Sequence, residues 1–360
     1  MNKDNIVLEN LLEEAIENYK VCIRLLRMPP DINSRVSISY VPFLSVTLLD
    51  IIDKLDCKFK VDHYYSQPNY TFTQLLQEHR LILKQGTEQR SYKKICNEIK
   101  KSLEMNYLYL TKDYNIIQKM CISLFGQKDF SVYTYKNLPY MNNIQNNKMH
   151  KLFLDKRGNL SSADIKTFAG SASNFLQLFI SQFINVGILE KEVENRGVQE
   201  SDFAMKDYFV YEQNRANYFK NNLEDSHNIY LFNLLCLVNS SNYVYPEVLG
   251  LGGQALKRIR IMTYLIMIKG LWQYQKEFHD ISLDLQRLLD EYNQLFEKKE
   301  DRQAFRNHLF HFDIPTEAIY ERDLISTLIN HYIRVEEEVF NTILANAFEV
   351  FSIEMQKILF

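Results

Sequence analysis

The sequence predicts a predominantly all-α fold, and three observations support this prediction. Apolar residues recur at helical spacing along most of the chain. The 360 residues include 10 glycines and 7 prolines, which is few for a protein built of strands and turns. Hydrophobic residues make up 46% of the chain, which is enough to bury a substantial core and more than a disordered chain contains.

Residues 1–150 are expected to form a helical N-terminal region. Ile6, Leu11 and Ala15 lie on one face of a first helix over 5–27, which the segment MPPDINSRVS is expected to end. Further helices are expected at 43–57, 70–84, 88–105 and 113–125. No motif in this region indicates its role.

A change of pattern at 127–160 marks a soft boundary between two regions. Aromatic residues alternate there around Pro139 and an Asn-rich centre, which predicts a loop or a short β-hairpin at about 130–160. Residues 160–360 are expected to be helical again, with a four- or five-helix bundle at about 225–360. The expected helices are 162–188, 200–222, 228–238, 254–276, 278–297, 301–311, 316–334 and 335–358.

Charge and cysteine usage narrow the class of protein. A formal net charge of -3 argues against a protein that coats nucleic acid broadly, but it leaves room for a small basic site. The five cysteines form no C-x-x-C pair and no signal-peptide pattern opens the sequence, so reduced thiols in a cytoplasmic protein are expected. The longest apolar stretches fall short of the roughly 20 residues that a spanning helix needs, so no membrane partner is expected.

The segment RNHLFHFDIP, which opens at Arg306, carries the pattern that indicates chemistry. An arginine precedes a histidine by five or six residues twice, from Arg302 to His308 and from Arg306 to His311, and Asn307 directly follows the second arginine. The Arg306 guanidinium can grip phosphate oxygens, and the His311 imidazole can move protons near neutral pH. Asn307 would orient the histidine or the phosphate by hydrogen bonds. His308 is interpreted as a neighbour of the site and not as a catalyst.

Helix geometry and capping leave two interpretations of this segment open. On an ideal helix Arg306 and His311 would lie about 140° apart. Pro315 disfavours helical geometry at the residue before it, so His311 is expected in the last turn. A long arginine side chain, or a second copy of the chain across a two-fold axis, would close the gap. The same residues also fit an ordinary helix end, because the helix dipole favours basic side chains there.

The sequence RNHLFHFDIPTEAIYERDLISTLINHYI resembles the HEPN ribonuclease superfamily, whose signature is R-[N/D/H]-x3–5-H near the end of a bundle helix. It is most similar to the second HEPN domain of the type VI RNA-guided CRISPR effectors, over residues 225–360 at most. Those effectors are far larger and carry two such motifs, whereas this chain carries one. It is more similar in this respect to smaller HEPN toxins and abortive-infection proteins, which dimerise to bring two motifs together.

The resemblance implies a metal-independent endoribonuclease, a hydrolase without a cofactor, that cleaves single-stranded RNA. The catalytic residues would be Arg306, Asn307 and His311, and the protein would act as a homodimer in prokaryotic antiviral defence or in a toxin–antitoxin pair. An antitoxin or a guide or sensor RNA would be its further partner. One alternative is a non-catalytic helical protein that binds RNA or another protein, such as an antitoxin or a CRISPR effector accessory. The other is a compact RNA-guided effector that targets RNA.

Basic residues near the motif are weaker candidates for RNA contacts, because ordinary surface charge explains them equally well. They lie in the segment KRIR after a glycine-rich turn, in the segment EKKEDR before the motif, and within the motif itself. These residues are Lys257, Arg258, Arg260, Lys298, Lys299, Arg302 and His308.

Three aspartates at helical spacing have the side-chain type that binds metal ions. Asp50, Asp53 and Asp56 are followed by Cys57 and His63. The solvated face of an amphipathic helix is the favoured interpretation of this spacing, so no metal site is predicted.

Overall fold

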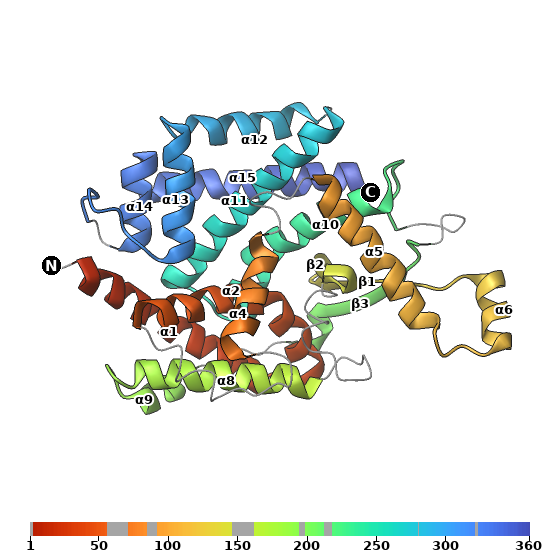
Figure 1. Cartoon of the computed structure of the whole chain (residues 1–360), viewed down its shortest axis with the longest axis horizontal. Coiled ribbons are helices and arrows are strands. Elements are labelled where there is room, and N and C mark those ends of the chain that lie inside the picture. The colour runs from red at the N-terminus through yellow and green to blue at the C-terminus, as the bar shows by residue number, and fades with distance from the viewer. Residues whose placement is uncertain are drawn as a thin grey trace.

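Helices make up most of the chain in the computed structural model, which confirms the predicted fold class (Figure 1). The residues that the structure describes are 3–55, 71–84, 92–145, 162–193, 199–211, 218–279, 281–320 and 323–360.

The N-terminal helices follow the predicted pattern with one difference. They are α1 (Lys3–Arg27), α2 (Pro30–Leu55), α4 (Phe72–Lys84), α5 (Tyr92–Thr111) and α6 (Ile116–Phe125). The segment MPPDINSRVS is expected to separate the first two helices, but the break is shorter because α2 already begins at Pro30. Proline suits the first helical turn, where its fixed φ is favourable and its missing N–H costs nothing. α2 continues through Pro42, so the helix predicted at 43–57 is the second half of a longer one.

The predicted hairpin is confirmed, and a third strand joins it. β1 (Phe130–Tyr135) pairs with β2 (Leu138–Asn142) through a two-residue turn at Lys136 and Asn137. Both turn residues have positive φ, as a turn that follows the right-handed twist of the strands requires. β3 (Phe203–Tyr208) pairs antiparallel with the other edge of β1, giving the order β2-β1-β3.

The prediction of a helix at 200–222 is therefore wrong. The backbone groups of β3 pair with β1, a strand far away in the sequence, and local periodicity carries no information about such a partner.

Most C-terminal helices lie close to their predicted positions, but the start predicted at 316 for the helix 316–334 is wrong. That helix begins at Leu324, where the side chain of Asp323 accepts from the Ser326 N–H and caps the first turn. The single helix predicted at 162–188 is divided into α8 (Ser162–Ile180) and α9 (Val186–Glu192). The others are α10 (Asp225–Asn239), α11 (Gly253–Phe278), α12 (Leu283–Gln294), α13 (Lys299–His311), α14 (Leu324–Ile333) and α15 (Glu337–Leu359). A π-helical segment, Ser240–Val248, extends α10.

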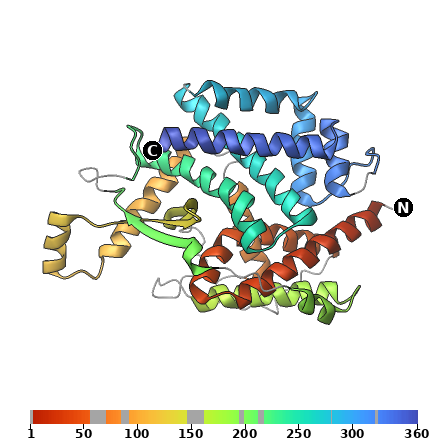
Figure 2. The ribbon, with the colours of Figure 1, turned by 180° about the vertical axis from the view of Figure 1, so that it is seen from behind.

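One hydrophobic core includes both regions expected from the sequence. Its buried side chains run from Ile6 to Leu359. α1 packs against α2, α8 and α11, while α10 packs against β2, α5 and α15. Figures 1 and 2 show α1, α2 and α8 beneath the layer formed by α10 to α15. The segment 127–160 therefore does not separate two cores.

Two further expectations concern thiols and membrane spans. The described cysteines, Cys22, Cys96, Cys121 and Cys236, are free thiols. One helical window, Ile32–Lys54, is long and apolar enough to cross a membrane by length and composition, but 89% of it is buried inside the protein. It is a central helix of the core.

Candidate functional site

The motif occupies the C-terminal half of α13, where packing fixes the helix end. Phe305, Leu309 and Phe310 are buried and hold the helix on the core. Phe312 adopts a left-handed conformation with φ 47°, and its N–H donates to the carbonyl of His308. The helix therefore ends through this cap, three residues before Pro315. His311 is the last helical residue, which confirms the prediction that it lies in the final turn.

An arginine from α4 covers the imidazole of His311. Nη2 of Arg80 lies 3.0 Å from Nδ1 of His311, 3.2 Å from its Nε2 and 3.4 Å from the carbonyl oxygen of Phe310. The two ring nitrogens flank Cε1, so an atom this close to both lies over the face of the ring and not in its plane. Nη2 of Arg80 thus approaches the exposed imidazole of His311 from above the ring.

Arg306 lies on the same helix near this contact. Its Cζ lies 5.1 Å from the ring centroid of Phe310, four residues further along α13. Its charge is also close enough to lower the pKa of Arg80. Asn307, the third residue of the motif, is exposed.

The pKa of Arg80 is lowered, and the causes of this shift identify the charges that surround its contact with His311. Burial is the largest cause that lowers it, and the guanidiniums of Arg258 and Arg306 lower it further, while Asp50 and Asp53 raise it. Arg80 and Arg306 are thus electrostatic neighbours beside an exposed imidazole. Like charges brought together in this way favour the binding of an anion.

Arg258 lies beneath the motif, and the prediction that it contacts RNA is wrong. Its side chain is 1% exposed, and it donates to Glu14 Oε1 at 2.9 Å and to Asp50 Oδ2 at 2.5 Å. Its Nε donates to the carbonyl of Leu309 at 2.9 Å, and its Cζ lies 4.6 Å from the ring centroid of Phe312. Burial opposes its charge, but the two carboxylates raise the pKa of Arg258. Arg258 therefore holds the end of α13 in place from inside the core.

Other basic candidates are already engaged within the protein. Lys257 Nζ lies 2.5 Å from Glu337 Oε1. The guanidinium of Arg302 lies 5.0 Å from the ring centroid of Trp272, and Arg260 is half-buried.

The remaining candidates divide between the two ends of α13. Lys298 and Lys299 are exposed where the helix begins, at the opposite end from His311. His308 stacks on Tyr332 with ring centroids 5.9 Å apart, and its Nδ1 lies 3.7 Å from Asp313 Oδ2. This placement fits a neighbour of the site.

The aspartates of α2 do not share a solvated face. Asp50 is buried on Arg258, so the favoured interpretation is wrong for this residue, whereas Asp53 is exposed. Asp56, Cys57 and His63 lie outside the described residues. Within the described part of the chain, no group of three or more His, Cys, Asp and Glu side chains could hold a metal ion.

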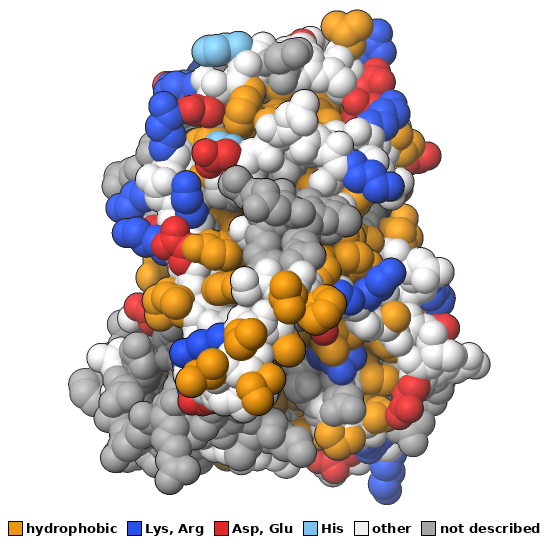
Figure 3. Space-filling model, turned by 90° about the vertical axis from the view of Figure 1, so that its right-hand side faces the viewer, with side chains coloured by type: hydrophobic (Ala, Val, Ile, Leu, Met, Phe, Trp, Pro, Cys, Tyr) orange, Lys and Arg blue, Asp and Glu red, His pale blue; other side chains and the backbone are white. Residues whose placement is uncertain are grey.

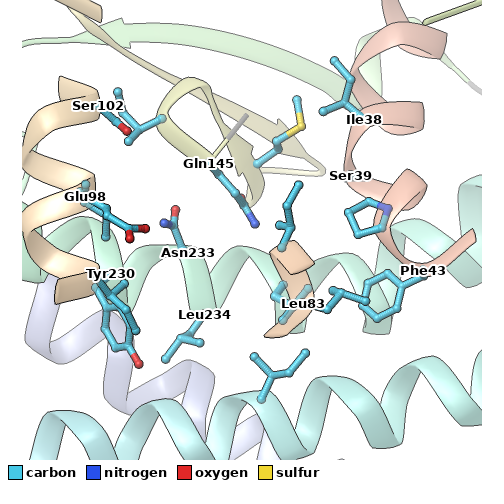
Figure 4. Close-up of a pocket in the computed structure, with 18 residues that line it drawn as sticks. Ile38, Ser39, Phe43, Leu83, Glu98, Ser102, Gln145, Tyr230, Asn233 and Leu234 are labelled. Atoms are coloured by element: carbon cyan, nitrogen blue, oxygen red, sulfur yellow. The ribbon is translucent and has the colours of Figure 1, made fainter. Parts of the chain in front are cut away.

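A separate apolar cavity of about 130 Å³ lies among α2, α4, α5, β2, α10 and α11 (Figure 4). Glu98, Asn233 and Gln145 gather on one side of it, with Phe43 and Leu83 on the other. The described residues that line it include no His, Cys, Lys or Arg. It therefore offers shape and apolar surface but lacks the groups that the motif supplies.

The site contains one residue that sequence reasoning missed. Arg80 is far from the motif in the sequence, and nothing around it in α4 distinguishes it from a surface arginine. Comparison with known proteins found no match to any protein-family model, any curated protein or any solved structure. The function must therefore be argued from the chemistry of the site.

Proposed function

We propose that the protein is a metal-independent endoribonuclease of the HEPN type that cleaves single-stranded RNA at the end of α13. The observation that carries the proposal is the contact of Arg80 Nη2 with the exposed imidazole of His311, with Arg306 close enough to lower the pKa of Arg80. Two guanidiniums beside a group that titrates near neutral pH suit a phosphodiester substrate.

The reaction needs proton transfer and stabilisation of negative charge. The RNA 2′-hydroxyl attacks the adjacent phosphorus, its proton passes to neutral His311, and the bond from phosphorus to the 5′-oxygen breaks. Arg80 and Arg306 stabilise the charge that builds up on the phosphate oxygens. Neutral His311 is the form that acts as the base in this step.

The second proton transfer supports pairing of two copies. The departing 5′-oxygen needs a proton, and one imidazole that has just begun to accept a proton cannot donate another. His311 of a second copy would act as the acid, so the homodimer belongs to the proposal. Arg80 and Arg306 supply two guanidiniums within one chain. The second copy of the chain is therefore needed for its His311 and not for a further arginine.

The experiment measures cleavage of a labelled single-stranded RNA by the wild type and by Arg306→Ala and His311→Ala. Loss of the acid–base group or the phosphate contact is expected to lower the rate on the order of 10²–10⁴-fold. Arg287→Ala provides the matched control, because Arg287 is 73% exposed on α12 away from the motif. Wild-type products should end in a 2′,3′-cyclic phosphate, and EDTA should leave the rate unchanged.

The outcomes of these measurements distinguish a ribonuclease from a non-catalytic RNA-binding module. An RNA with 2′-deoxy sugars should bind and resist cleavage, because the nucleophile is missing. Full cleavage by both alanine variants would reject the proposal. RNA binding that depends on Arg306, without cleavage under any condition, would identify the protein as a non-catalytic RNA-binding module instead.

A further inference from the structure

α6 stands at one end of the longest axis of the molecule and exposes its apolar side chains (Figure 1). None of its residues is buried. Ile116, Ile117, Met120, Leu124 and Phe125 are between 62% and 78% exposed. Apolar patches on this scale in a folded protein mark a binding surface.

The orientation of α6 is the reverse of what a surface helix normally adopts. At 100° per residue, these five side chains fall on one half of the helix. The open groove between α5 and α6 is lined from α6 by Lys119, Ile122 and Ser123, so the more polar side faces the protein. A capping box at Asn115 and Gln118 fixes the first turn of the helix. The apolar half therefore faces outward, ready for an apolar environment.

The charges around this face are positive. α6 contains no acidic residue, and Lys112, Lys119 and Lys128 accompany it, whereas Asp113 is the one acidic residue in 105–128. Lys112 lines the groove with Lys119, so both lie behind the apolar half and not within it. Figure 3 shows apolar side chains gathered on this end of the molecule, where the exposed side chains of α6 lie.

We propose that α6 docks on an anionic lipid bilayer, with its apolar half among the acyl chains and its lysines at the headgroups. A helix that lies in the membrane interface has this division into an apolar face and a basic one. Ten residues are too few to span a bilayer but suffice to lie in its surface. This inference concerns the opposite part of the molecule from the α13 site and stands independently of the proposed function.

The apolar face projects from the end of the molecule, which suits a planar surface better than a protein groove (Figure 1). The positive charges of Lys112, Lys119 and Lys128 are complementary to the anionic headgroups of phosphatidylglycerol.

The experiment is co-sedimentation of the full-length protein with vesicles of phosphatidylglycerol and phosphatidylcholine, compared with vesicles of phosphatidylcholine alone. Wild type should pellet with the anionic vesicles, and the double variant Ile117→Asp/Phe125→Asp should bind at least tenfold more weakly. Neutralising one lysine should weaken binding to anionic vesicles roughly fivefold. The double variant Lys112→Gln/Lys119→Gln should therefore lose affinity for anionic vesicles. Raising the salt concentration should have a similar effect.

Leu283→Asp is the matched control, since Leu283 is 77% exposed on α12, away from this patch. It should bind as the wild type does. Circular dichroism tests whether the α6 variants fold, which is expected because the substituted side chains are exposed. Failure of the folded wild type to pellet with anionic vesicles overturns the proposal, as does equal pelleting of the α6 double variant. A wild-type dimer that this variant dissociates, seen by light scattering without vesicle binding, would assign the face to a second copy.

Discussion

Two arginine clusters join the N-terminal helices to the end of α13, and they differ in burial and in charge. In the buried cluster, Arg258 meets the carboxylates of Glu14 and Asp50. In the surface cluster, Nη2 of Arg80 contacts the exposed imidazole of His311, and Arg306 lies close enough to lower the pKa of Arg80. The first cluster lies inside the core, whereas the second joins a half-buried arginine to an exposed imidazole, and the carboxylates of Asp50 and Asp53 also act on that arginine.

The difference indicates separate tasks for similar side chains. A buried guanidinium is stable when carboxylates and carbonyls satisfy its donors, and such a group fixes the elements that it joins. Arg258 fixes α13 by binding the carbonyl of Leu309. A surface cluster of cations contributes little to stability, and its electrostatic potential is available to an anionic substrate. The buried cluster thus positions the site, and the surface cluster would perform the chemistry.

The largest expected effect comes from removing the buried arginine. Arg258→Ala leaves Glu14 and Asp50 as uncompensated buried carboxylates, which costs about 3–5 kcal/mol of unfolding free energy. Chemical denaturation followed by circular dichroism measures the loss.

The triple variant Arg258→Met/Glu14→Gln/Asp50→Asn removes the charges together, so it should regain most of that stability. Arg287→Ala, which breaks an exposed ion pair with Asp284, should lower stability by less than about 1 kcal/mol. A loss of similar size in Arg258→Ala would mean that the two clusters do not differ as described.

The wrong assignment of Arg258 shows what the sequence did and did not contain. Periodicity predicted α13 and Pro315 predicted its final turn, because the apolar stripe of a helix and the restriction before a proline are both local properties. Arg258 lies on the apolar stripe of α11 next to the buried Ile259, and that was a usable sign of burial. Its partners come from α1 and α2, and the partner of His311 comes from α4. Contacts between distant segments leave no trace in local spacing, so Arg80 could not have been found in this way.

Acid should destabilise the part of the core that lies next to the surface cluster. The buried imidazole of His79, the sequence neighbour of Arg80, provides the test. His79 is buried next to Arg80 in the sequence, its Nδ1 lies 3.3 Å from Ser45 Oγ, and burial lowers its pKa from 6.5 to about 3. A depressed pKa in the folded state means that stability is fully present above pH 6.5 and is lost as the pH falls toward 3. The total loss from this group is roughly 5 kcal/mol at the acid end.

His79→Gln removes this titration, so its unfolding free energy should decline less steeply between pH 6.5 and 4 than that of the wild type. His331→Gln, at a half-buried position, should keep the wild-type slope. Denaturant titrations at a series of pH values measure both slopes. Identical slopes in the wild type and His79→Gln would show that protonation of His79 is not what destabilises the protein in acid.

The smallest effect on stability, and the sharpest contrast with Arg258, is expected from Arg80. Its contact with His311 is exposed, although its side chain is half-buried, so Arg80→Ala should cost less unfolding free energy than Arg258→Ala. Under the proposed mechanism the same variant loses a charged contact to the phosphate, which is worth about 1.5–3 kcal/mol and corresponds to roughly a 10- to 100-fold lower cleavage rate. Arg80→Lys keeps the charge but not the planar fork of the guanidinium, so it should recover part of the rate at most. Lys299→Ala, at the other end of α13, should leave the rate within a few-fold of the wild type. If Arg80→Ala instead lowers stability as much as Arg258→Ala does, both clusters are structural, and α4 contributes to the fold of α13 and not to its chemistry.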